Sequence, residues 1–148
     1  MKTNYSLRYA SHPVDAKNYD TQRLRKEFLI DTLFVNDEVN MVYSMYDRMI
    51  VGGVMPKAET LRLEAIDPLK ATYFTTRREI GVFNVGEGEG VVKVGEESFT
   101  LGFKEALYIG SGDREVLFES KDPQHPAKFY FNSTCAHTSY PCRKVTKQ

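Results

Sequence analysis

The sequence predicts an all-β fold, and three observations support this prediction. Apolar and polar side chains alternate in several short runs, which is typical of strands with one buried face. Clusters of glycine, asparagine, aspartate and proline separate these runs at short intervals. A chain of 148 residues is long enough to bury one core. Many short strands in one domain favour a closed barrel or two stacked sheets. The clearest alternating runs are residues 41–45, 92–94, 99–101 and 129–131.

Residues 20–29 depart from the alternating pattern. Asp20 is a favoured residue type at a helix N-cap, and Leu24 and Phe28 lie one helical turn apart. We therefore expect a short amino-terminal helix before the sheet. No linker, repeat or low-complexity tract follows it, so residues 1–148 are expected to form a single domain.

Composition and charge exclude several classes of protein. The formal net charge is zero, so the chain lacks the basic surplus that nucleic acids or anionic membranes attract. No apolar run approaches the roughly 20 residues of a membrane span, and the first residues lack the apolar part of a signal peptide. With only two cysteines and no export signal, we expect a cytoplasmic protein in which Cys135 and Cys142 are free thiols.

The middle of the chain aligns with the two sequence motifs of cupin barrels, which read G-x5-H-x-H-x3,4-E-x6-G and G-x5-P-x-G-x2-H-x3-N. Glu79 stands seven residues before Gly86, and Gly102 and Gly110 have the glycine spacing of the second motif. In such motifs, histidines on alternate strand positions point to one face and hold a metal ion together with the glutamate. The glycine spacing therefore predicts a cupin-like jelly-roll barrel.

The positions of the metal ligands hold unsuitable residues. Thr72 and Phe74 occupy the first two histidine positions, and Asp113 occupies the third. Threonine is a poor ligand for a divalent ion and phenylalanine is not a ligand. We therefore expect this barrel to hold no metal.

Six longer stretches, taken in order along the chain, resemble one enzyme family. They are residues 20–29, 41–56, 73–82, 105–110, 126–132 and 136–141. Together they resemble the amino-terminal half of the 5-keto-4-deoxyuronate isomerases (4-deoxy-L-threo-5-hexosulose-uronate ketol-isomerases). The resemblance implies interconversion of 5-keto-4-deoxyuronate and 3-deoxy-glycero-2,5-hexodiulosonate during the breakdown of pectin and uronates. It also implies a cytoplasmic hexamer with two cupin-like halves, and a zinc ion held by three histidines and one glutamate of the carboxy-terminal half. No ligand of that set maps onto a residue of this chain.

Three functions remain open at this point. The chain is part of a ketol-isomerase that is inactive without its other half, or a structural module that builds the oligomer, or a cupin domain that binds carbohydrate. The expected partners are a small sugar-acid substrate, the carboxy-terminal cupin half and further copies of the chain. Nucleic acid and membrane are not expected as partners.

Arg77 and Glu79 are the candidate substrate-binding residues, and no catalytic residue is assigned. An arginine can hold a substrate carboxylate through two parallel hydrogen bonds. Strand alternation places Arg77 and Glu79 on one face and Arg78 on the other. The alternative is a purely structural role, in which Arg77 pairs with Glu79 or Arg78 lies at a subunit interface.

Two further patterns are more simply explained by structure. Cys135, His137 and Cys142 offer three soft ligands for zinc, but a structural zinc site usually has four ligands. A terminal strand and loop with incidental thiols is therefore the favoured interpretation. Residues 86–90 alternate glycine with glutamate, and their carboxylates would repel phosphate, so they predict a hairpin turn rather than a phosphate-binding loop.

Overall fold

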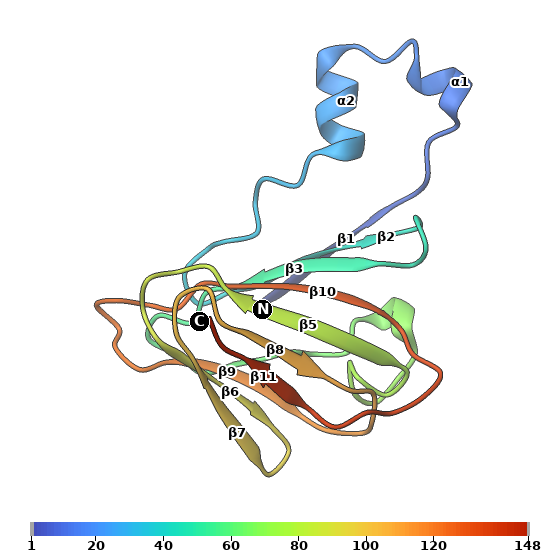
Figure 1. Ribbon diagram of the computed structural model, residues 1–148. Coiled ribbons are helices and arrows are strands. Elements are labelled where there is room, and N and C mark those ends of the chain that lie inside the picture. Colours follow the sequence, from blue (N-terminus) through green and yellow to red (C-terminus); the bar gives the residue numbers. More distant parts are fainter. Residues whose placement is uncertain (1, 148) are drawn as a thin grey trace.

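The computed structural model describes residues 2–147 and shows two β-sheets that share one core (Figure 1). The all-β class predicted from the alternating runs is confirmed. No strand pairing joins the two sheets among the described residues, so they face each other without closing into one hydrogen-bonded barrel. The larger sheet contains, in spatial order, β1 (Thr3–Arg8), β2 (Val39–Ser44), β3 (Ile50–Val54), β10 (Phe129–Cys135), β5 (Arg78–Asn84), β8 (Ala106–Ile109) and β11 (Arg143–Val145). The smaller sheet contains β4 (Leu61–Arg62), β9 (Val116–Ser120), β6 (Gly90–Val94) and β7 (Glu97–Leu101).

Alternate residues of each central strand enter the core. In β5, Ile80 and Val82 are buried, and their opposite partners on β10 are Ser133 and Phe131. Phe131 meets the ring of Phe74 edge to face, with ring centroids 5.9 Å apart. Aromatic pairs of this geometry add roughly 0.5–1.5 kcal/mol to the effect of burial alone. The core is thus built by the period-two pattern that the sequence displays.

Gly52 on β3 makes room for the ring of Phe131. It lies opposite Phe131 in the β3–β10 register. A Cβ atom at Gly52 would lie 2.2 Å from the Phe131 ring, far closer than two carbon atoms can approach. Glycine is needed here for close approach of a side chain to the backbone and not for a positive φ.

Two helices project from the sheets as an arm between β1 and β2 (Figure 1). These are α1 (Pro13–Ala16) and α2 (Thr21–Phe28), and the structure also has a 3-10 turn, η1 (Asp67–Leu69). The predicted cap is confirmed, because Asp20 Oδ1 accepts a hydrogen bond of 2.8 Å from the backbone N–H of Arg23. Leu24 and Phe28 are exposed, and neither helix has a buried residue. In residues 2–147, no helix has the length and apolar character that crossing a bilayer would require.

The predicted helix does not come first in the chain, because β1 precedes it and pairs with β2 in parallel. The sequence analysis missed this strand. Tyr5 and Leu7 alternate with Asn4, Ser6 and Arg8, so the strand-like pattern is present in the sequence, but all four middle residues of β1 are exposed and add nothing to the core.

Asn84, at the end of β5, fixes the loop that joins the two sheets. Its side chain is fully buried, and its Nδ2 donates to the carbonyls of Gly88 and Leu101, each at 2.9 Å. Its Oδ1 accepts from the N–H groups of Gly86 at 3.0 Å and Lys128 at 3.3 Å. The glycine-rich segment after β5 is therefore an ordered connection to β6 in the other sheet. The predicted hairpin turn is wrong, because β5 and β6 do not pair with each other.

We expect Asn84→Ala to lower the free energy of unfolding by about 3 kcal/mol, because it leaves several buried backbone groups without a partner. Urea denaturation followed by circular dichroism measures the change. Glu87→Ala, an exposed position in the same loop, is the matched control and should change stability by less than about 0.5 kcal/mol. Equal stability of Asn84→Ala and the original chain would contradict this account of the loop.

Candidate functional site

A pocket of about 200 Å³ opens where β5 begins and β10 ends. Segments far apart in sequence build it, namely the turn between β2 and β3, the loop from η1 to β5, and the two strand ends. None of its lining residues carries a carboxylate. The pocket is therefore positively charged at neutral pH. Its lining includes three guanidinium groups, one thiol and two aromatic rings, contributed by Arg48, Arg77, Arg78, Cys135, Tyr43 and Phe74.

Arg78 is the most deeply buried charge in this pocket, with an exposed fraction of 3%. Arg78 is the first residue of β5, two positions before Ile80, so both side chains point to the same face of the strand. The strand that contributes Ile80 to the core therefore also directs Arg78 inside. Its Nε donates to Ser133 Oγ at 3.1 Å, and its Nη2 donates to the carbonyls of Ser133, at 3.0 Å, and Arg48. Nη1 contacts the Cys135 sulfur at 3.5 Å. All of these acceptors are uncharged oxygen atoms or the sulfur of a thiol.

The surroundings of Arg78 lower its pKa below the ordinary value. Burial is the largest cause, and the positive charge of Arg48 acts in the same direction, whereas Cys135 and Tyr43 oppose it. The Tyr43 ring lies 5.6 Å from the guanidinium carbon and offers a cation–π contact. An arginine nevertheless keeps its proton at neutral pH. The pocket therefore holds a permanent, buried positive charge.

Arg48 reaches the pocket from a two-residue hairpin turn. Asp47 and Arg48 both have φ of +53°, and the turn is closed by a hydrogen bond of 3.2 Å from Met49 N–H to the Tyr46 carbonyl. Positive φ at both central residues suits the twist of a tight hairpin, but it costs on the order of 1 kcal/mol at each residue that is not glycine. The turn brings the Arg48 carbonyl within hydrogen-bonding distance of Arg78 and the Arg48 side chain to the pocket.

Arg77 lines the mouth of the same pocket and is exposed. Its Nη2 donates to the carbonyls of Leu69 and Lys70, the latter at 3.1 Å. Arg77 therefore ties the loop after η1 to the start of β5. Its Nε and Nη1 donors make no hydrogen bond to any of the residues that the structure describes.

Glu79 lies on the opposite face of the larger sheet from Arg78. Its Oε2 accepts a hydrogen bond of 2.6 Å from the Tyr108 hydroxyl on neighbouring β8. Arg77 and Glu79 were expected to share one face, and the alternative was a direct ion pair between them. Instead, Arg77 contacts backbone carbonyls at the pocket mouth, while Glu79 contacts a tyrosine on the outside of the sheet. The structure therefore separates the two predicted residues.

The residues at the cupin ligand positions do not converge on one point. Thr72 is exposed, Phe74 packs in the core, and Glu79 faces away from it. Asp113 is exposed in a loop and accepts a hydrogen bond of 2.7 Å from Thr76 Oγ1. Within residues 2–147, no group of three histidine, cysteine, aspartate or glutamate side chains could hold a metal ion together. A zinc ion therefore does not fit these positions.

The two cysteines are free thiols that point to different surroundings. Cys135 contacts Arg78 in the pocket, whereas the Cys142 sulfur contacts Arg114 Nη1 at 3.5 Å. His137 is exposed on the segment between them. These three residues thus form no common metal site in the described part of the chain.

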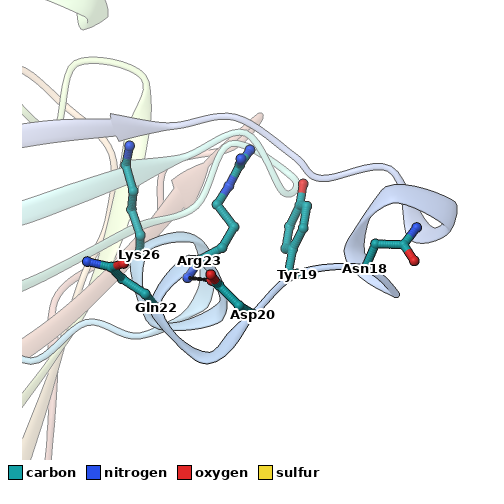
Figure 2. Close-up of a pocket in the computed structure, with 6 residues that line it drawn as sticks. All are labelled: Asn18, Tyr19, Asp20, Gln22, Arg23 and Lys26. Carbon is teal, nitrogen blue, oxygen red and sulfur yellow. Dashed lines mark hydrogen bonds between the residues drawn. The ribbon is translucent and has the colours of Figure 1, made fainter.

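A larger groove follows one side of α2, and Figure 2 shows the side chains that line it. The dashed line in that view is the Asp20 cap of the helix, and the Arg23 guanidinium lies over the Tyr19 ring at 4.6 Å. Arg23 also pairs with Glu27 one turn further along at 2.9 Å. The groove is open to solvent, and its visible contacts stabilise the helix and its entry, so we do not assign it a ligand.

Sequence reasoning missed Arg48 as a lining residue and did not assign Arg78 to a pocket. The signal for Arg78 was present, because it lies two residues before the core residue Ile80 on the same strand. No sequence signal indicates Arg48, since its approach depends on how the β2–β3 hairpin meets the end of β10.

Tyr108 provides a direct test of the Glu79 contact. Burial, and then the hydrogen bond and charge of Glu79, raise the pKa of Tyr108 to about 12. Because this pKa lies above the ordinary 10, the contribution of Tyr108 to stability is present below pH 10 and is lost as the pH rises through about 12. We expect Glu79→Gln to move the Tyr108 pKa part of the way back toward 10. Ultraviolet titration of the tyrosinate band measures this, with Tyr108→Phe identifying the Tyr108 signal among the nine tyrosines. An unchanged pKa in Glu79→Gln would contradict the contact.

Comparison with known proteins identifies strong sequence relatives. The chain is 67% identical over 147 residues to a 4-deoxy-L-threo-5-hexosulose-uronate ketol-isomerase of Bacteroides fragilis, a match that covers 99% of this chain and 52% of the relative. It is 68% identical over 147 residues to ketol-isomerase 1 of Bacteroides thetaiotaomicron, with the same coverage of both chains. It is 49% identical over 142 residues to the enzyme of Escherichia coli O127:H6, covering 95% of this chain and 51% of the relative. No family model matches the chain.

Solved structures give weaker matches. Protein Ylba from E. coli superposes with a TM-score of 0.48 at 10% identity, covering 66% of this chain and 38% of that chain. Vicilin from tomato gives a TM-score of 0.37 at 14% identity, covering 66% of this chain and 25% of that one. Neither superposition carries an argument about fold or function.

The sequence matches carry the assignment. The chain spans about half the length of the curated relatives it matches, and the identity extends along nearly all of its own residues. By sequence, nearly the whole chain is therefore similar to the amino-terminal half of the 4-deoxy-L-threo-5-hexosulose-uronate ketol-isomerases.

Proposed function

We propose that this chain serves as the amino-terminal half of a ketol-isomerase that acts on a keto-deoxyuronate. The observation that carries this proposal is the 67% identity over 147 residues to a protein named for that activity. The reaction would interconvert 5-keto-4-deoxyuronate and 3-deoxy-glycero-2,5-hexodiulosonate. Such a reaction moves a proton next to a carbonyl group, and it requires a positioned base and acid.

The proposed division of labour assigns the metal chemistry to the carboxy-terminal half. The family resemblance implies a zinc ion there. In this half, Thr72, Glu79 and Asp113 do not converge on one point, which supports a metal site in the other half. This half would then bind substrate, support the catalytic half, or do both. We further propose that its two sheets form a cupin-like jelly-roll barrel, which the shared core and the glycine spacing support.

Assembly is a further part of the proposal. Exposed apolar side chains lie on the larger sheet, with Phe83 on β5, Val85 just after it and Val145 on the edge strand β11. Exposed apolar surface favours association where it is contiguous. It supports contact with the carboxy-terminal half or with further copies, up to the hexamer that the resemblance implies. A role in pectin and uronate breakdown and a cytoplasmic location belong to the same proposal.

A structural or carbohydrate-binding module without turnover is the second candidate. The absence of a converging ligand set at the described cupin positions favours it for this chain taken alone. Isothermal titration of the chain with a deoxyuronate distinguishes a structural module from a carbohydrate-binding module, because a purely structural module releases no heat.

We expect the purified 148-residue chain to show no isomerase activity, and a protein that joins it to a family carboxy-terminal half to be active. A chelator should abolish the activity of the longer protein, and zinc should restore it, since the metal site is proposed to lie in the added half. A coupled assay of product formation measures both. Turnover by the 148-residue chain that a chelator leaves unaffected would contradict the division of labour.

Arg77 and Glu79 remain proposed substrate contacts, with different structural support. Arg77 has donors at the pocket mouth that no described residue accepts from, whereas the Glu79 carboxylate accepts from Tyr108 on the outer face. In the two-domain protein, we expect Arg77→Ala to raise KM roughly tenfold with a smaller change in kcat, the cost of one charge-assisted contact. Steady-state kinetics measures this, with the exposed loop variant Glu87→Gln as control.

Glu79→Gln measured in parallel locates the second contact. A KM increase in Glu79→Gln would place part of the substrate on the outer face of the larger sheet. Unchanged KM in both Arg77→Ala and Glu79→Gln would remove these residues from the binding machinery.

A further inference from the structure

We propose that the pocket at the start of β5 is a binding site for a small organic carboxylate, which Arg78, Arg48 and Arg77 hold together. The proposal goes beyond the isomerase assignment, because it concerns a site within this chain and does not depend on turnover. Four features of the pocket support it.

The first feature is a buried charge with no counter-ion. Arg78 is 3% exposed, and no ion pair involves it among residues 2–147. Its acceptors are the hydroxyl and carbonyl of Ser133, the carbonyl of Arg48 and the thiol of Cys135. A buried charge is expensive unless an opposite charge and hydrogen bonds compensate for it. Hydrogen bonds are present here, and the opposite charge is the missing part.

The second feature is an unused donor on that charge. A guanidinium has five N–H groups, and the contacts above occupy four of them. The remaining N–H is on Nη1, whose other contact is a weak one to sulfur at 3.5 Å. Nη1 is therefore the part of Arg78 that a ligand oxygen can approach. The same oxygen can also replace the weak contact between Nη1 and the Cys135 sulfur.

The third feature is the accumulation of like charge. Arg48 lines the pocket and is close enough for its charge to disfavour the charged form of Arg78, and Arg77 lines the mouth. Like charges held close together destabilise one another, and an anion placed between them reverses that effect. The hairpin turn holds Arg48 here in spite of its unfavourable φ of +53°.

The fourth feature decides the class of anion. Tyr43, Phe74, Pro68 and Leu69 place apolar patches beside the guanidinium groups in a lining that is otherwise mainly polar, and the volume of about 200 Å³ is below that of a drug-sized site. These patches can contact the carbon atoms of an organic acid, whereas inorganic phosphate has no carbon to place there. The pocket therefore fits a small organic acid, or the acid end of a larger one.

The test is isothermal titration of the 148-residue chain at low salt with four probes. Galacturonate and propionate represent a sugar acid and a simple acid, galactose is the uncharged counterpart of the sugar acid, and inorganic phosphate represents anions without carbon. We expect at least one carboxylate to bind in the millimolar range or tighter, galactose not to bind, and affinity to fall with added salt.

Comparing the affinities of the two carboxylates shows which class of acid the pocket prefers. Much tighter binding of galacturonate than of propionate identifies a sugar-acid site, and equal affinities identify a general carboxylate site. Binding of phosphate without either carboxylate, or no binding by any probe, would overturn the proposal.

Variants locate the binding in the pocket. Arg78→Lys keeps the buried charge but cannot reach Ser133, the Arg48 carbonyl and a ligand at the same time, so we expect at least about tenfold weaker binding. Because this buried change can impair folding, Arg48→Gly is the second variant. It removes a pocket guanidinium while glycine accepts the positive φ, so we expect unchanged or higher stability together with severalfold weaker binding.

Asp47→Gly is the matched control for Arg48→Gly, since Asp47 has the same φ of +53° and does not line the pocket. It should bind the carboxylate at least as tightly as the original chain. Carboxylate affinity that is unchanged in both Arg48→Gly and Arg78→Lys would place the binding elsewhere and overturn the proposal.

The two thiols give an independent readout. Cys135 lines the pocket and Cys142 does not, although both are partly buried. A bound carboxylate should slow the reaction of Cys135 with neutral N-ethylmaleimide several-fold and leave Cys142 unaffected. Peptide mass spectrometry measures the two rates in the same sample. Equal protection of both thiols, or protection of neither at saturating carboxylate, would contradict a ligand in this pocket.

Discussion

The register between β5 and β10 is the constraint on which the rest of the molecule depends. It places Ile80 opposite Ser133 and Arg78 opposite Cys135, so one face of β5 builds the core and ends in a buried arginine. Glu79 necessarily faces the other way, toward Tyr108. A shift of one residue would exchange these faces and expose the whole apolar set. Burial of the core thus fixes which charged side chain enters the molecule and which remains outside.

This constraint explains why a cupin-like arrangement of glycines does not create a metal site here. The ligand positions Thr72, Phe74 and Asp113 lie on a loop, in the core and on a second loop, and Glu79 has the wrong parity. The interior of the sheet end holds a cation instead. An inward guanidinium repels a divalent metal and attracts an anion, so this end of the sheet has the electrostatic preference opposite to that of a metal site.

The arm formed by α1 and α2 follows a different physical rule. Its helices are stabilised locally, by the Asp20 cap and the Arg23–Glu27 pair, and they bury no side chain. Short helices of this kind are marginal without packing. Its apolar residues Leu24 and Phe28 are exposed, so burial against the sheets does not stabilise this arm.

The sequence alone determined the all-β class, the Asp20-capped helix and the similarity to the ketol-isomerases, because alternation, capping and long similar stretches are local properties of the chain. The alternation of Tyr5 and Leu7 in β1 was overlooked, and strand parity placed Arg77 and Glu79 on one face. Arg77 precedes the strand and turns to carbonyls of a preceding loop, so alternation does not govern it. Only the tertiary structure gathered Arg48, Arg77 and Arg78 around one pocket. The physical reason is that proximity between a hairpin turn, a loop and two strand ends is set by burial of the shared core and not by any local pattern of residues.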